Sequence, residues 1–136
     1  MRVAFCGHGK INYDNEVRNK LIEIIEELIE HGADEFLLGG YGNFDIMSAH
    51  IVYDLKQKYP HIQSILIVPY LNRDYDRTWY DGSIYPPLEK VPKRFAIVKR
   101  NEWMVDNADV IISYVKNDWG GAYKTLEYAK KREKKL

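Results

Sequence analysis

The sequence predicts an α/β fold, a Rossmann-like three-layer sandwich with a mainly parallel sheet. Short apolar runs of strand length alternate along the chain with longer segments of helical periodicity. Several of the apolar runs end directly in glycine, as buried strands do where the chain turns into a helix. A chain of 136 residues with 46% hydrophobic residues fits one core. We therefore expect a single domain over residues 1–136.

The first half of the chain predicts two strand–helix units. The run "RVAFCG", residues 2–7, has the length and flanks of a buried strand. Apolar residues then recur at helical spacing with glutamates on the opposite face, and Gly32 ends this helix. A second strand, "EFLLGG" (residues 35–40), precedes a second helix, "FDIMSAHIVYDLKQKYP" (residues 44–60), which Pro60 closes.

The second half is less regular. A third strand is predicted over "SILIVPY", residues 64–70, and the polar, aromatic and proline-bearing segment 71–94 predicts no element. A helix is expected near residues 101–107, a strand over "DVIISYV" (residues 109–115), and a last helix over about residues 121–133. Strands that alternate with helices in this way favour parallel pairing.

Composition argues against several classes of protein. The 20 basic and 20 acidic residues balance, which makes nucleic acid an unexpected partner. The single cysteine, Cys6, allows no internal disulfide, and no apolar run approaches the roughly 20 residues that cross a membrane. With no signal peptide at the N-terminus, we expect a cytoplasmic protein. His8 lacks companion ligands in the sequence, so we expect no metal. We also expect no cofactor.

Three glycine turns are predicted at the same edge of the sheet, the edge where ligands of such folds bind. They are "CGHGK" after the first strand, "GGYGNFD" after the second and "NDWGGAYKT" after the last. Glycine admits close backbone approach, and bare N–H groups at a helix N-terminus suit a phosphate. The alternative is that the glycines only allow tight turns. The candidate ligand-binding residues are Gly7, His8, Gly39, Gly40, Gly42, Asn43, Asp45, Arg100, Asn101, Gly120, Gly121, Ala122 and Tyr123.

These turns, together with "KRNEWMVDNADVIISYV" and "GGAYKTLEYAKK", resemble the SLOG superfamily, which includes the Smf DNA-processing proteins and the Lonely Guy phosphoribohydrolases. The resemblance covers nearly the whole chain and is closest to the small one-domain YpsA-like branch. It implies a binder of a nucleotide-derived ligand that acts as a sensor or sequesters a signal.

The Lonely Guy pattern can be set against the C-terminal third of the chain. Arg100 falls on its arginine and Glu127 on its glutamate, the pair that in those enzymes cleaves a base from ribose 5′-monophosphate. Asn101, Tyr123 and Lys124 depart from the pattern. The resemblance thus leaves hydrolysis by Arg100 and Glu127 as an alternative, and the departures favour binding without turnover.

Each candidate side chain also has a purely structural interpretation. Arg100, expected at the start of a helix, either clamps a phosphate or ribose oxygen or is a solvated arginine. Asp45 either accepts ribose hydroxyls or complements the dipole of its helix. Glu127 is either part of the site or an exposed helical glutamate. His8 is a candidate for hydrogen bonding or proton transfer, and Asn43 either contacts the ligand or caps the second helix.

Segment 71–94, with Tyr70 before it, is rich in tyrosine and arginine. Such residues either stack on a base or pack against a second subunit, and we favour a homo-oligomer. A third functional class remains beside binder and enzyme, namely an adaptor whose aromatic surface binds another protein and whose nucleotide site is vestigial.

Overall fold

The computed structural model describes residues 1–8, 15–115 and 118–131 of the chain. Their elements follow the order β1 (Arg2–Gly7), α1 (Asn15–Glu30), β2 (Glu35–Leu38), α2 (Asn43–Leu55), β3 (Gln63–Ile67), β4 (Gly82–Ile84), a 3₁₀ turn (Lys93–Phe95), α3 (Ala96–Asn107), β5 (Val110–Tyr114) and α4 (Gly121–Lys131). The five strands form one sheet in the order β4-β3-β2-β1-β5, and every pair is parallel. The predicted α/β fold is confirmed.

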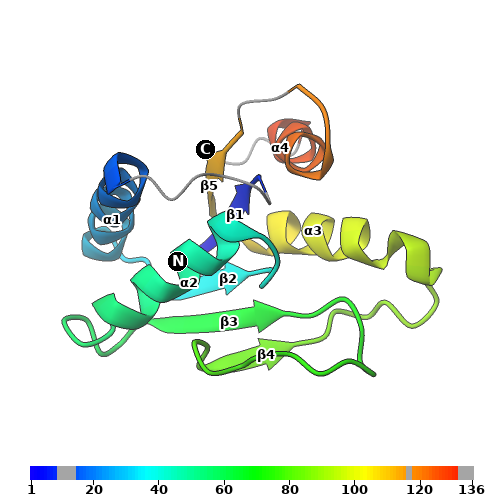
Figure 1. Ribbon diagram of the computed structural model, residues 1–136, viewed down its shortest axis with the longest axis horizontal. Coiled ribbons are helices and arrows are strands. Elements are labelled where there is room, and N and C mark those ends of the chain that lie inside the picture. The colour runs from blue at the N-terminus through cyan, green and yellow to red at the C-terminus, as the bar shows by residue number, and fades with distance from the viewer. Residues whose placement is uncertain (9–14, 116–117, 132–136) are drawn as a thin grey trace.

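The sheet lies between two pairs of helices, α1 with α2 and α3 with α4 (Figure 1). Each face has its own apolar core. Phe36 and Leu38 of β2 pack with α1 and α2, whereas Leu37 of the same strand packs with α3 and α4. Successive strand residues point to opposite faces, so a strand buried on both sides must be apolar throughout. This explains the continuous apolar runs in the sequence.

The direction of the chain through the sheet reverses beside β1. From β1 the chain adds β2, β3 and β4 on one side, and it then returns to place β5 on the other side. Gly7, at the end of β1, is in register with Tyr114, at the end of β5. In open parallel sheets ligands bind outside the carboxyl ends of the strands near such a reversal. The fold therefore places the glycine turns at the expected edge.

Two elements differ from the sequence prediction. The segment expected to be irregular contains β4, a three-residue edge strand whose sequence, GSI, carries no hydrophobic pattern. Helix α3 begins at Ala96 rather than near residue 101. Its first turn exposes Ile97 and Val98, which obscures the amphipathic spacing. The predicted end of the last helix, residue 133, lies outside the described residues.

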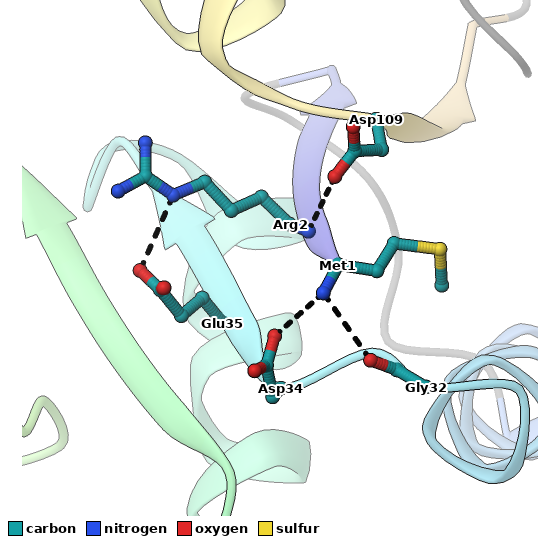
Figure 2. Close-up of polar contacts among 6 residues, drawn as sticks. All are labelled: Met1, Arg2, Gly32, Asp34, Glu35 and Asp109. Carbon is teal, nitrogen blue, oxygen red and sulfur yellow. Dashed lines mark hydrogen bonds and ion pairs between the residues drawn. The ribbon is translucent and has the colours of Figure 1, made fainter.

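The amino ends of three strands are held together by exposed polar contacts (Figure 2). The amino group of Met1 donates to Asp34 Oδ1 at 2.8 Å, and the Arg2 side chain pairs with Glu35 at 3.3 Å. The backbone N–H of Arg2 donates to Asp109 Oδ2 at 2.9 Å. Asp109 thus ties β5 to β1 at the edge opposite the glycine turns.

No helix among the described residues is long and apolar enough to cross a membrane.

Candidate functional site

Arg100 is buried, which corrects the expectation that it begins a helix at the surface. It lies in the second turn of α3 and is only 4% exposed. Its Nη1 donates to the carbonyl oxygens of Gly39 at 2.9 Å and Ile67 at 3.0 Å, and its Nε donates to Asn101 Oδ1 at 2.9 Å. Among the described residues Nη2 has no hydrogen-bond partner. No buried side-chain nitrogen or oxygen of that part of the chain lacks a partner, so Nη2 is reached by solvent. Nε and Nη1 of the guanidinium thus bind other parts of the protein, and Nη2 is available to a ligand.

Asp45 lies in the first turn of α2, as predicted. Part of the residue is reached by solvent, but its carboxyl group is surrounded by protein atoms. Burial raises the pKa of Asp45 to about 7, although the charge of Arg100 and the backbone N–H groups of Tyr41 and Gly39 act in the opposite direction. Burial likewise lowers the pKa of Arg100, partly offset by Asp45. Asp45 is therefore poised to gain or lose a proton near neutral pH.

Gly39 brings these two side chains together. A Cβ atom on Gly39 would lie 3.0 Å from Asp45 Oδ2 and 3.1 Å from Arg100 Cζ. Asp45 and Arg100 nevertheless form no direct ion pair with each other; the ion pairs of the described residues are elsewhere. The Asp45 carboxylate, an acceptor, and the Arg100 guanidinium, a donor, thus lie beside the Cα atom of Gly39, which carries no side chain. They do not form an ion pair with each other. A ligand hydroxyl or phosphate oxygen fits such a pair.

Tyr80 adds a hydroxyl group that sequence reasoning did not assign to the site. Its Oη would lie 3.6 Å from a Cβ on Gly40, beside the Gly39 turn. Within the described part of the chain this hydroxyl makes no hydrogen bond, and solvent reaches it although the residue is half-buried. Burial, with the negative charge of Asp45, raises the pKa of Tyr80 to about 12, so the group is a protonated donor at neutral pH. The richness of segment 71–94 in tyrosine was the only signal in the sequence.

Packing or backbone geometry accounts for four of the predicted glycines, Gly7, Gly40, Gly42 and Gly120. A Cβ on Gly7 would lie 2.3 Å from the ring of Phe44, and one on Gly40 would lie 2.5 Å from Leu66 Cδ1. Gly40 and Gly42 also have positive φ angles, 71° and 89°. A Cβ on Gly120, whose φ is 92°, or on Gly121 would meet no atom within 4 Å. The space beside Gly120 and Gly121 in the β5–α4 turn is therefore open among the described residues.

The remaining candidate ligand-binding residues lie at the carboxyl edge of the sheet, where several of them make contacts within the protein. The N–H of His8 donates to Tyr114 O at 3.3 Å. Asn43 is the first residue of α2, and the N-cap is Gly42, so the interpretation of Asn43 as the cap is wrong. Asn101 accepts the hydrogen bond from Arg100 Nε. Ala122 accepts a hydrogen bond from the buried Cys6 thiol at 3.1 Å, and Tyr123 lies half-buried in the first turn of α4.

Arg100 and Glu127 share no contact in the structure. Glu127 pairs with Lys130 at 3.5 Å, and its side chain is 40% exposed. The groups whose charges raise the pKa of Arg100 are Asp45, Tyr75 and Tyr70. The carboxyl group whose charge acts on the guanidinium is thus supplied by α2, not by α4. Among the described residues there is no group of three side chains that could hold a metal ion.

The parallel sheet, its reversal beside β1 and the glycine turns at the carboxyl edge define a Rossmann-like α/β protein. The sequence model of YpsA, described as the YspA SLOG family, matches residues 10–85, more than half of the chain. The chain therefore belongs to the YpsA SLOG family. It is 28% identical over 139 residues to the SPbeta prophage-derived protein YoqJ of Bacillus subtilis (strain 168), a match that covers 85% of this chain and 81% of YoqJ.

Two solved structures share the fold at low sequence identity. DNA processing protein A from Helicobacter pylori, whose structure was determined for its single-stranded DNA binding mode, has a TM-score of 0.68 at 20% identity. That match covers 98% of this chain and 62% of the H. pylori chain. The molybdenum cofactor carrier protein from Chlamydomonas reinhardtii has a TM-score of 0.62 at 16% identity. That match covers 98% of this chain and 72% of the carrier protein chain. At these identities the likeness shows the fold alone.

Proposed function

We propose that this protein binds a nucleotide-derived small molecule at the carboxyl edge of its sheet, as a sensor or as a protein that sequesters a signal. The observation that carries the proposal is the convergence of Asp45 and Arg100 over Gly39. Asp45 accepts ligand hydroxyl groups, as on a ribose, and Arg100 Nη2 donates to a hydroxyl or phosphate oxygen. The open glycines at the start of α4 suit a phosphate, since the helix N-terminus presents free N–H groups there.

Binding is favoured over hydrolysis by the position of Glu127. A phosphoribohydrolase that uses Arg100 and Glu127 needs both groups at the scissile bond. Here Arg100 is held by two backbone carbonyl groups, and Glu127 pairs with Lys130. Family membership and the existence of a cofactor-carrying protein with this fold support a ligand-binding role. We further propose that the protein acts in the cytoplasm and as a homo-oligomer.

The test of the ligand class is direct. The protein is purified without added ligand, denatured, and the released small molecules are identified by mass spectrometry. We expect a phosphate-bearing nucleoside derivative, present in wild type and absent or depleted in Asp45→Ala. Asp54→Ala is the matched control, because Asp54 lies on the same helix, pairs with Arg18 and is exposed. Retention of the same molecule by Asp45→Ala would contradict the proposed site.

Two alternatives are resolved by the same preparation. Incubation with nucleoside 5′-monophosphates should leave them intact over hours, and Glu127→Gln should not change that result. Rapid release of free base by wild type, lost in Glu127→Gln, would establish the hydrolase instead. Because the H. pylori relative in fold binds single-stranded DNA, a labelled oligonucleotide is included. Binding to it at physiological salt would overturn the expectation that nucleic acid is not a partner.

A further inference from the structure

A hollow of about 360 Å³ lies away from the glycine turns, between α2, the start of β3 and the chain that leads into β4. Val52, Tyr53, Lys56 and Gln57 of α2 line one side. Ser64 of β3 and residues 78–81 complete the lining. Its volume is within the range of small-molecule sites. Of the residues that line it, only Tyr80 also reaches the proposed nucleotide site.

The walls of the hollow are aromatic and held in place. The ring of Trp79 lies 4.2 Å from His50 and 4.9 Å from Tyr53, the latter in an edge-to-face arrangement. The carbonyl oxygen of Trp79 accepts a hydrogen bond from Ser64 Oγ at 3.3 Å. Tyr80 completes the wall, with its hydroxyl at the glycine turn beyond. Flat walls fixed in this way favour a flat aromatic ligand.

The charged groups in the hollow compensate each other. Lys56 Nζ donates to Asp81 Oδ1, and Asp81 Oδ2 accepts the backbone N–H of Ser64 at 2.8 Å. Both carboxylate oxygens are therefore occupied, and the pair has no net charge. A charged ligand would be attracted by one member of the pair and repelled by the other. The hollow consequently favours a neutral molecule.

The polar groups that remain include donors from Lys56 and Gln57. Within the described part of the chain, Lys56 Nζ bonds only to Asp81, which leaves two of its three N–H bonds available. The side-chain amide of Gln57, on an exposed residue, makes no hydrogen bond with any described residue. Acceptor atoms on the edge of a ring would match these groups.

We propose that this hollow is a second small-molecule site, which binds a neutral planar heteroaromatic ring with hydrogen-bond acceptors on its edge. The ring lies against Trp79 and Tyr53, and its acceptors face Lys56 and Gln57. Tyr80 lines the hollow and its hydroxyl group lies beside Gly40, so the two proposed sites are neighbours. They differ in their other side chains, because Asp45 and Arg100 do not line the hollow.

Caffeine is a suitable probe, because it is neutral, planar and soluble and carries only acceptors. In a titration followed by ¹H–¹⁵N NMR, we expect saturable shifts of the Trp79 indole N–H and of the Ser64 and Asp81 amides. Valerolactam, a saturated ring with the same kind of carbonyl acceptor, should not produce them. Trp79→Leu should abolish the shifts, and Gln57→Ala should weaken binding by roughly three- to tenfold, the effect of one neutral hydrogen bond.

Two control variants make the outcome decisive. Gln63→Ala removes an exposed glutamine of β3 outside the hollow and should leave caffeine binding unchanged. Asp45→Asn should also leave it unchanged, which separates this site from the nucleotide site. Gln57→Ala is exposed and retains the fold, so the test stands even where Trp79→Leu unfolds the protein. Shifts that do not saturate, that valerolactam reproduces, or that centre on residues 39–45 would overturn the proposal.

Discussion

The two edges of the sheet hold charged residues in opposite ways. At the amino edge, the contacts of Met1 and Asp34 are exposed, and mutual hydrogen bonding raises the pKa of the amino group and lowers that of Asp34 (Figure 2). At the carboxyl edge, burial raises the pKa of Asp45 and lowers that of Arg100. The protein favours the charged forms at the first edge and disfavours them at the second. Charges kept against a desolvation cost are typical of binding or catalytic sites.

The comparison also separates strand pairing from ligand binding. The amino-edge contacts connect β1 with the residues that precede β2 and β5, and their charged groups satisfy one another. At the carboxyl edge, Arg100 and Tyr80 retain donors without partners among the described residues. The first edge should matter for stability alone. The second should matter for ligand binding as well as for stability, and the predictions below test that difference.

The largest effect is expected for Arg100→Ala. The substitution leaves the carbonyl groups of Gly39 and Ile67 without their donor and removes the cation beside Asp45. We expect the free energy of unfolding to fall by about 3 kcal/mol or more, the scale of two hydrogen bonds to a charged group. Urea denaturation measures it, with Lys99→Ala, an exposed residue of the same helix, as the control. An unchanged midpoint would show that the buried contacts are not structural.

Asp45→Asn should weaken ligand binding and alter the pH dependence of stability. Because the pKa of Asp45 is raised to about 7 in the folded protein from an ordinary value of 3.8, the folded state holds its proton more tightly than the unfolded state. The wild type therefore loses stability as the pH rises from about 4 to about 7, by roughly 1–3 kcal/mol after allowance for partial exposure. The variant should lack this loss, as measured by unfolding at several pH values.

The same variant provides the binding half of the comparison. Affinity for the copurified nucleotide should fall by roughly tenfold or more, as for loss of a charge-assisted hydrogen bond. Asp54→Asn should change neither affinity nor the pH profile. A stability profile of Asp45→Asn that parallels wild type would mean that Asp45 titrates like an exposed carboxylate.

Tyr80→Phe tests the hydroxyl that segment 71–94 contributes. Since this hydroxyl makes no hydrogen bond within the described residues, its removal should leave thermal stability unchanged. Nucleotide affinity should fall by roughly three- to tenfold through loss of one neutral hydrogen bond. Isothermal titration measures the change, and Tyr85→Phe in the same segment is the control. Equal affinity in wild type and Tyr80→Phe would exclude the hydroxyl from the site.

The smallest effect is expected at the amino edge, for Asp109→Ala. It removes an exposed side-chain acceptor of the Arg2 backbone N–H and should lower the free energy of unfolding by about 1 kcal/mol or less. Nucleotide affinity should be unchanged, because the contact lies at the opposite end of the strands. A loss of affinity comparable to that of Asp45→Asn would show that the two edges are not independent.

The sequence by itself determined the layers and the edge at which the site lies. Buried parallel strands are apolar throughout, and the run "EFLLGG" predicted both β2 and the turn that follows it. The helical spacing before Gly32 likewise predicted α1. Glycines after strand-length runs indicated the carboxyl edge, since the ends of parallel strands meet there. These features depend on local periodicity, which one sequence displays.

Only the tertiary structure decided which side chains meet. Arg100 contacts Gly39 and Ile67, 61 and 33 residues away, and no periodicity specifies such pairs. The position of Glu127 beside Lys130, rather than beside Arg100, depends on how α3 and α4 lie on the sheet. Strand β4 and the Tyr80 hydroxyl were equally hidden, because a three-residue polar edge strand forms through pairing with β3 rather than through its own pattern. Long-range packing, not local preference, assembled the candidate site.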